Sequence, residues 1–384
     1  MTIDLDRAQE IFAASVDGTV GIEEEFAILD PESLDMVPRF EELRDAAAER
    51  DSVLAESIAG ELISSEIEIT SGRGKSVEDA LARQRDARRR LFELTGDRGA
   101  VLSATGTHPW ADYREQLNID TEHYRRVVDG LQYVARRNNT FSTHVHVGVN
   151  DLDRAVRVCD RLRPVLPTLL ARSANSPFLD GLDSGLHSAR SQAFTKSFPR
   201  CGIPDAYGSW HEYRDYLQLL IDTDSVQEYT QIWWSVRPHF SFGTVEVRIC
   251  DSQSDAAETD ELVKLMTACV MQAVADEDEG RPAANLPRRL IEENFWRAIR
   301  FGQDGKLLDF QARREIPVAE ALDGLLAWTA PARVAAGIGD VEVSAPNGAQ
   351  RQRAMIDAGA SMQETFAAAV RETQNSYVRG PYVQ

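Results

Sequence analysis

The chain has 384 residues, of which 43% are hydrophobic and 27% charged, a composition that excludes extensive disorder and can fill a large core. The formal net charge of -20 disfavours binding to nucleic acid or to an anionic membrane surface. Because no segment approaches about 18 consecutive apolar residues and no signal-peptide pattern is evident, we expect a cytoplasmic protein without membrane or nucleic-acid partners.

The pattern of apolar and turn-forming residues predicts a mixture of helices and strands, followed by mainly helix. The expected elements, in chain order, are helix 4–15, strand 19–29, helix 39–50, strand 62–70, helix 76–95, strand 100–105, helix 121–137, strand 140–149, helices 151–173 and 211–222, and strand 243–250. We expect an α+β protein forming a single catalytic domain over residues 1–384, with its core at about 18–303 and a mainly helical part at 256–375.

The stretch 174–210 is irregular and rich in Ser, Gly and Pro, but it also contains several aromatic residues. Long structureless segments inside compact domains are usually functional or disordered, and the aromatic residues argue against disorder. We therefore expect this stretch to act as a lid over a binding site.

Four of the expected strands carry polar side chains at alternate positions. Because side chains alternate across a strand, residues two apart share a face. The polar positions on one face are Glu23 and Glu25, Glu66 and Glu68, His144 and His146, and Thr244, Glu246 and Arg248. Each strand alone is typical of a solvated sheet face. Together they would place carboxylates, imidazoles and a guanidinium group on one surface without any lysine.

Such a surface favours metal binding, because crowded carboxylates cannot all stay ionised without a counter-ion. Magnesium prefers carboxylate and phosphate oxygens, so several Glu and a His facing a cleft indicate two or more Mg²⁺ ions with a triphosphate. Arg237 and Arg248 could hold a phosphate or a substrate carboxylate through paired N–H donors, or form structural ion pairs.

Two other motifs compete with this interpretation. His144 and His146 could instead begin a zinc site, but the other histidines show no matching pair. The segment 72–76 (GRGKS) resembles the end of a phosphate-binding P-loop, but Ile69 stands where that motif requires Gly.

Four motifs occur in an order that resembles a known family: residues 21–26 (GIEEEF), 104–109 (ATGTHP), 144–148 (HVHVG) and 243–248 (GTVEVR). They are similar to the bacterial carboxylate–amine ligases of the glutamate–cysteine ligase type 2 group, over roughly residues 18–303. The resemblance implies a curved antiparallel sheet with helices on its outer face, as in glutamine synthetase and guanidino kinases. It also implies Mg²⁺-dependent use of ATP to form an acyl phosphate, with an amino acid and an amine as substrates, glutamate and cysteine above all.

The resemblance also implies roles for residues of this chain. The expected metal-linked positions are Glu23, Glu25, Glu68, His146 and Glu246. Arg248 would contact phosphate or substrate. Beyond the resemblance, we expect His144 near the nucleotide, and Arg237 beside Arg248 as a second catalytic residue. Ser64 stands where relatives often carry Gln, which bears on the choice of substrate.

Other functions remain open at the level of sequence, because one fold can serve several activities. A metal-dependent amide hydrolase on the same scaffold would work without ATP. A non-catalytic nucleotide-binding or amino-acid-binding protein would bind ligand without turnover. A homodimer is a reasonable expectation for the assembly.

Overall fold

The computed structural model describes residues 4–284 and 286–379. Its centre is a seven-stranded sheet in the order β10-β11-β5-β1-β3-β2, with β4 also paired to β1, and every pairing in it is antiparallel. The strands of this sheet are β1 Val20–Leu29, β2 Ile58–Ala59, β3 Glu66–Thr70, β4 Val101–Ser103, β5 Ser142–Gly148, β10 Val236–His239 and β11 Thr244–Asp251. This arrangement confirms the predicted α+β class with an antiparallel sheet.

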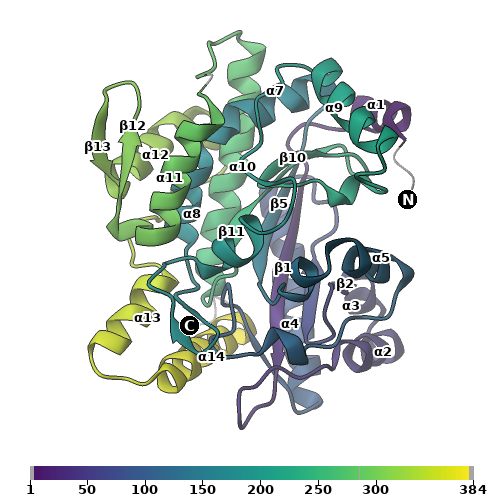
Figure 1. Ribbon diagram of the computed structural model, residues 1–384, viewed down its shortest axis with the longest axis vertical. Coiled ribbons are helices and arrows are strands. Elements are labelled where there is room, and N and C mark those ends of the chain that lie inside the picture. The colour runs from purple at the N-terminus through teal and green to yellow at the C-terminus, as the bar shows by residue number, and fades with distance from the viewer. Residues whose placement is uncertain (1–3, 285, 380–384) are drawn as a thin grey trace.

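Helices account for most of the remaining chain. They are α1 Leu5–Ala13, α2 Phe40–Arg50, α3 Ser52–Ser57, α4 Val77–Asp97, α5 Glu122–Leu131, α6 Tyr133–Arg136, α7 Leu152–Leu162, α8 Leu166–Ser173, α9 Trp210–Asp222, α10 Ala256–Asp278, α11 Arg288–Phe301, α12 Val318–Ala335, α13 Gly348–Asp357 and α14 Met362–Arg379. The strands β12 Lys306–Asp309 and β13 Arg314–Pro317 form a separate hairpin beside α11 and α12 (Figure 1). Among the described residues, no helix is both long and apolar enough to cross a bilayer.

Several predicted elements differ from the structure at their ends or are interrupted. The strand expected from residue 62 begins at Glu66, because Ser64 instead donates its backbone N–H to the Leu117 carbonyl at 2.8 Å. The helix expected at 121–137 breaks at Gln132, whose φ of 49° is incompatible with a continuous helix. The helix expected at 151–173 divides at a 3₁₀ turn, Arg163–Val165, which contains a proline.

The irregular stretch 174–210 contains short ordered elements. These are the hairpin of β6 Phe178–Leu179 and β7 Leu182–Asp183, a π-helical turn Ser191–Thr195, and β8 Cys201–Gly202, which pairs in parallel with β9 Trp233–Trp234. The predicted division between an irregular segment and its flanking helices α8 and α9 therefore agrees with the structure, although the segment is not structureless.

One face of the sheet is covered by helices, and this face holds the core. Val145 and Val147 of β5 join Val245, Val247 and Ile249 of β11 in a single buried apolar cluster with residues of α7, α8 and α10. The alternation of these strands therefore sends their valines towards the helices and their acidic and imidazole groups to the other face. The expectation of a single domain stays a prediction, as do the homodimer and the cytoplasmic location.

A buried ion network fixes the centre of β1 to the helical layer. The side chain of Glu24 is fully buried and accepts hydrogen bonds from Arg88 Nε at 2.6 Å and Gln84 Nε2 at 2.8 Å, both on α4. Arg88 Nη1 also donates to Asp260 Oδ1 of α10 at 2.7 Å. The hydroxyl of Tyr377, on α14, lies 3.1 Å from Glu24 Oε2. Helices α4 and α14 thus meet β1 at Glu24, and Arg88 extends the network to α10.

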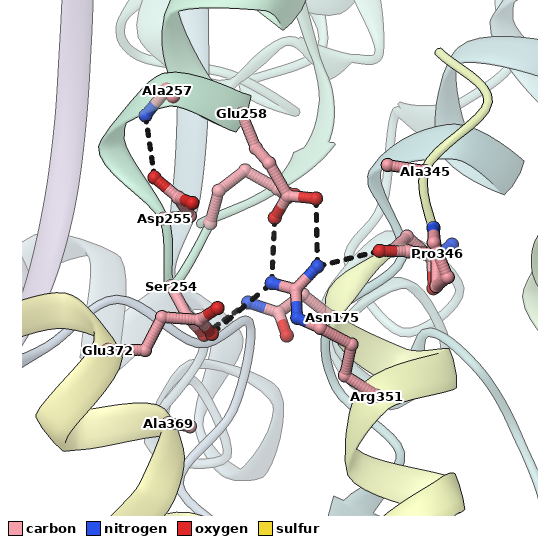
Figure 2. A network of polar contacts seen from close by, with 12 residues as sticks. Asn175, Ser254, Asp255, Ala257, Glu258, Ala345, Pro346, Arg351, Ala369 and Glu372 are labelled. Carbon is pink, nitrogen blue, oxygen red and sulfur yellow. Dashed lines mark hydrogen bonds and ion pairs between the residues drawn. The ribbon is translucent and has the colours of Figure 1, made fainter. Parts of the chain in front are cut away.

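The C-terminal helices are joined to the rest of the fold by a second network (Figure 2). Arg351 of α13 donates to both carboxylate oxygens of Glu258 in α10, each at 2.8 Å, and to Glu372 of α14 at 3.2 Å. Gln352, the next residue, donates its side-chain N–H to Asn175 Oδ1 at 2.8 Å. The C-terminal segment therefore contacts the beginning of the irregular stretch as well as the helical layer.

Replacing Arg88 by Met should lower the free energy of unfolding by about 3–5 kcal/mol, because Glu24 and Asp260 would remain buried without their charge partner. The matched control is Arg89→Met on the same helix. Arg89 is largely exposed and its ion pairs should contribute no more than about 1 kcal/mol. Urea unfolding of both variants measures the difference. If both variants lost the same free energy of unfolding, the buried network would not stabilise the fold more than a surface ion pair does.

Candidate active site

The uncovered face of the sheet forms a cavity of about 250 Å³. The predicted site residues that line it are Glu23, Glu25, Glu68, His144, Arg237, Glu246 and Arg248. His146 lies in the wall of an adjoining cavity and reaches Glu23 from there, with its Nε2 atom 3.1 Å from Glu23 Oε1. The structure therefore brings every residue predicted for the site into one region.

The register of the sheet explains this convergence. Glu23 on β1 pairs with His144 on β5, and Glu25 on β1 pairs with Glu68 on β3. On the other side of β5, His146 pairs with Glu246 of β11. Directly opposed residues on one face of an antiparallel pair have Cβ atoms about 4.5–5.5 Å apart, so their polar groups lie close enough to interact.

Glu23 lies between the two imidazoles. Its Oε2 atom is 3.1 Å from His144 Nδ1, and its Oε1 atom faces His146. Burial alone would raise the pKa of Glu23, but the charge of His146 and the contacts with both histidines hold this pKa well below its usual value. Glu23 is consequently an ionised carboxylate held in place from two sides.

Glu25 is held by a different partner from β5. The backbone N–H and the hydroxyl of Ser142 donate to Glu25 Oε2 at 2.6 and 2.7 Å. The same hydroxyl lies 2.8 Å from His144 Nε2, so Ser142 joins Glu25 to the imidazole that contacts Glu23. Both acidic side chains of β1 are therefore oriented by the strand beside them.

Glu246 forms ion pairs with both predicted catalytic arginines. Arg237 Nε donates to Glu246 Oε2 at 2.6 Å, and Arg248 donates to Oε1. Burial would raise the pKa of Glu246, but the charges of Arg237 and Arg248 keep it well below its usual value. Arg248 nevertheless has a buried Nε atom without a hydrogen-bond partner among the described residues. Arg248 therefore forms a structural ion pair with Glu246 and keeps its Nε–H group available for another acceptor.

Glu61, which was not predicted, also lines the cavity. Burial and the charges of Glu25 and Glu23 raise its pKa to about 8. Burial and the charge of Glu23 raise the pKa of Glu68 as well. Glu61 precedes the ordered strand and follows no alternating pattern, so strand periodicity gave no signal for it. Its proximity in sequence to Glu66 and Glu68 was the one available indication.

The residues present fit a divalent cation. Three overlapping groups each place three ligand atoms within 4.8 Å of one another: Glu23, Glu68 and His144; Glu23, His146 and Glu246; and Glu25, Glu61 and Glu68. His146 Nε2 is also buried without a correctly aligned hydrogen-bond partner among the described residues. Carboxyl groups with raised pKa values, and an imidazole that gives up its proton, are groups that can bind a cation.

The segment before α9 contributes further residues that sequence analysis missed. Arg190, Phe194 and Phe198 line the cavity, and Arg190 comes just before the π-helical turn. Arg190 Nη1 and Nη2 donate to the carbonyls of Ile249 and Arg248 at 3.2 and 3.3 Å. No periodic pattern marked this position, because the surrounding chain is irregular.

Comparison with known proteins agrees with this geometry. The sequence profile of glutamate–cysteine ligase family 2 (GCS2) matches residues 19–375. The chain belongs to this family. It is therefore an enzyme of the class that forms carbon–nitrogen bonds, and the resemblance inferred from the motifs is confirmed.

Two relatives illustrate the extent of the likeness. A protein of Solibacter usitatus, provisionally named glutamate–cysteine ligase 2, is 38% identical over 308 residues, which are 80% of this chain and 79% of that protein. The glutamate–cysteine ligase of Natronomonas pharaonis is 35% identical over 343 residues, 88% of this chain and 92% of that protein. The family likeness thus extends well beyond the four motifs.

Solved structures share the fold at much lower sequence identity. Glutamate–cysteine ligase from Francisella tularensis, solved in complex with AMP, has a TM-score of 0.68 at 12% identity, covering 95% of this chain and 90% of that chain. A bifunctional glutathione synthetase from Pasteurella multocida also has a TM-score of 0.68, at 13% identity, covering 98% of this chain and 55% of that chain. Both place the present chain in the fold of these ligases.

The raised pKa of Glu61 predicts how stability depends on pH. The folded protein holds this proton more tightly than the unfolded chain, whose Glu pKa is near 4.5. The stabilisation is therefore present below pH 4.5 and is lost as pH rises towards 8. The free energy of unfolding of the native protein should therefore fall between pH 5 and pH 8. Glu61→Gln removes the titrating group, so the fall in this variant should be smaller by at least about 1 kcal/mol.

Urea unfolding at both pH values measures this difference. Glu56→Gln, at an exposed position on α3, is the control for the change in charge and should keep the native pH dependence. If Glu61→Gln and Glu56→Gln gave the same pH dependence as the native protein, the carboxyl group of Glu61 would not have a raised pKa.

Proposed function

We propose that this enzyme joins glutamate to cysteine in an ATP-dependent and Mg²⁺-dependent reaction that proceeds through an acyl phosphate. The supporting observation is the set of three overlapping acidic and imidazole groups on one sheet face, beside two arginines. Phosphoryl transfer depends mainly on positioning and charge neutralisation, and this face supplies groups suited to both. A nucleotide and two amino acids are accordingly the proposed ligands.

The proposed metal ligands are Glu23, Glu25, Glu68, His146 and Glu246, with Glu61 added from the structure. Bound Mg²⁺ would neutralise phosphate charge and orient the triphosphate. Glu23 and Glu68 suit ligands shared between ions, because each belongs to two of the three groups. Ser142 and His144 would keep the carboxylates of β1 in the required orientation.

Arg248 and Arg237 are proposed to act on the transferred phosphoryl group. Glu246 holds both guanidinium groups in place, and the unused Nε of Arg248 could donate to a phosphate oxygen. Such a donor, fixed before the substrate binds, stabilises developing charge without reorganisation during the reaction.

In the proposed reaction, an oxygen of the substrate carboxylate takes the γ-phosphoryl group and ADP leaves. The amine nitrogen then attacks the carbonyl carbon of the acyl phosphate, phosphate leaves, and the surplus amine proton passes to a base. Because water would compete with the amine, the segment 174–210 is proposed to close this side of the cavity through Phe194 and Phe198.

The relatives support the choice of substrates. The Natronomonas protein carries the name glutamate–cysteine ligase, and the matching family has the same designation. The AMP bound to the Francisella ligase supports a nucleotide site in this fold.

An ADP-release assay tests the reaction directly. With glutamate, cysteine, ATP and Mg²⁺, we expect ADP and a glutamyl-cysteine product in equal amounts, and removal of Mg²⁺ by a chelator should abolish both. Cysteine should be compared with a panel of other amines. Release of ADP with another amine alone would change the substrate, whereas amide hydrolysis without ATP would contradict the proposed ligation.

Glu23→Gln and Glu246→Gln should each lower the rate of ADP formation by about 10²–10³-fold, because each removes a charged group from the proposed phosphate site. Glu56→Gln, the exposed control, should retain the native rate. Full ATP turnover by the first two variants would show that these carboxylates do not bind the catalytic metal.

A further inference from the structure

A buried acidic side chain and a buried basic side chain in the cavity each have one polar atom without a hydrogen-bond partner among the described residues. Glu66 is 1% exposed, and its Oε2 atom has no hydrogen-bond partner among the described residues. Arg190 is 2% exposed, and its Nε atom likewise has no hydrogen-bond partner in the part of the chain that the structure describes. Both side chains line the cavity. Unsatisfied buried polar groups are costly, so this pair points to a ligand that supplies the missing contacts.

Arg190 is held in place without a close carboxylate partner. The nearest recorded carboxylate atom is Asp251 Oδ1, at 3.8 Å from Nη1. The oxygens of Asp251 already accept hydrogen bonds from the hydroxyls of Ser176 and Ser188 and from the backbone N–H of Asn175, at 2.6–2.9 Å. The other two arginines of the cavity form close ion pairs with Glu246, so Arg190 is the one positioned to take a further carboxylate.

Glu66 is distinct from the proposed metal ligands, although it shares a strand with Glu68. It belongs to none of the three groups of possible cation ligands found among the described residues. Burial and the charges of Glu25 and Glu61 raise the pKa of the Glu66 carboxyl group, and the charge of Arg190 acts in the opposite direction. A carboxyl group and a guanidinium that line the same cavity are complementary to the ammonium and carboxylate groups of an α-amino acid.

We propose that Glu66 and Arg190 form the subsite that binds the α-ammonium and α-carboxylate groups of the acid substrate. This inference rests on the proposed ligase function. The acid substrate is favoured over the amine, because an attacking amine must lose its proton and so could not stay paired with Glu66 as an ammonium ion. Once both α-groups are bound, the side-chain carboxylate is the one left to be phosphorylated.

Binding of L-glutamate and two analogues tests the assignment. Glutarate lacks the ammonium group, and 4-aminobutyrate lacks the α-carboxylate. Calorimetry on the full chain with Mg²⁺ and a non-hydrolysable ATP analogue should show that L-glutamate binds about 10-fold or more tightly than either, because each analogue leaves one buried charge without its partner.

Glu66→Gln should weaken L-glutamate binding about 10-fold or more and leave glutarate binding unchanged. Arg190→Lys should weaken binding of L-glutamate and glutarate, and leave 4-aminobutyrate binding unchanged, because lysine cannot reproduce the fixed pair of N–H donors. Glu56→Gln is the control for charge, and thermal unfolding establishes that each variant is folded. Should Arg190→Lys fail to fold, Glu66→Gln alone still decides the ammonium contact.

The opposing outcomes separate this inference from the proposed function. Suppose that the native enzyme ligates glutamate to cysteine. If Glu66→Gln then binds L-glutamate with native affinity, or loses affinity for glutarate as much as for L-glutamate, the subsite is wrong and the function stands. If the native enzyme neither binds L-glutamate nor releases ADP with it, both proposals are wrong.

Discussion

The site depends on the confinement of carboxylates on strand β1 and its neighbours, where burial makes uncompensated negative charge costly. Glu23 is stabilised as an anion by two imidazoles, whereas Glu61 and Glu68 have raised pKa values. The protein thus contains both a fixed anion and carboxyl groups that readily hold protons. A cation can replace those protons, which connects the electrostatics of the sheet with the proposed use of Mg²⁺.

The two faces of the sheet have complementary roles. On the covered face, apolar residues and the Glu24–Arg88 pair fix β1 against α4. On the other face, Glu23 and Glu25 are consequently presented at defined positions to β5 and β3. Glu24 lies between these two acidic residues, so the same strand carries a structural anion in one direction and the proposed metal ligands in the other. Rigid support of this kind is what a preorganised site requires.

Much of the site could be predicted from sequence. Strand alternation alone puts the members of each of three pairs on the same face of their strand: Glu23 and Glu25, His144 and His146, and Glu246 and Arg248. The order of the strands could not be predicted, because the pattern does not say which strand lies beside β1. Glu61 and Arg190 were missed because they lie in irregular segments, where no period relates a residue to a face. The partner of Glu24 was equally hidden, since Arg88 is 64 residues away in the chain.

The central claim, that the acidic face of the sheet is a cation site, is tested most directly by diffraction from crystals grown with Mn²⁺ in place of Mg²⁺ and a non-hydrolysable ATP analogue. Anomalous scattering would locate the ions without reference to activity. The account predicts peaks within coordination distance of Glu23, with further ligands drawn from Glu68, His146 and Glu246. A nucleotide bound at the cavity with no metal peak beside these side chains would contradict it.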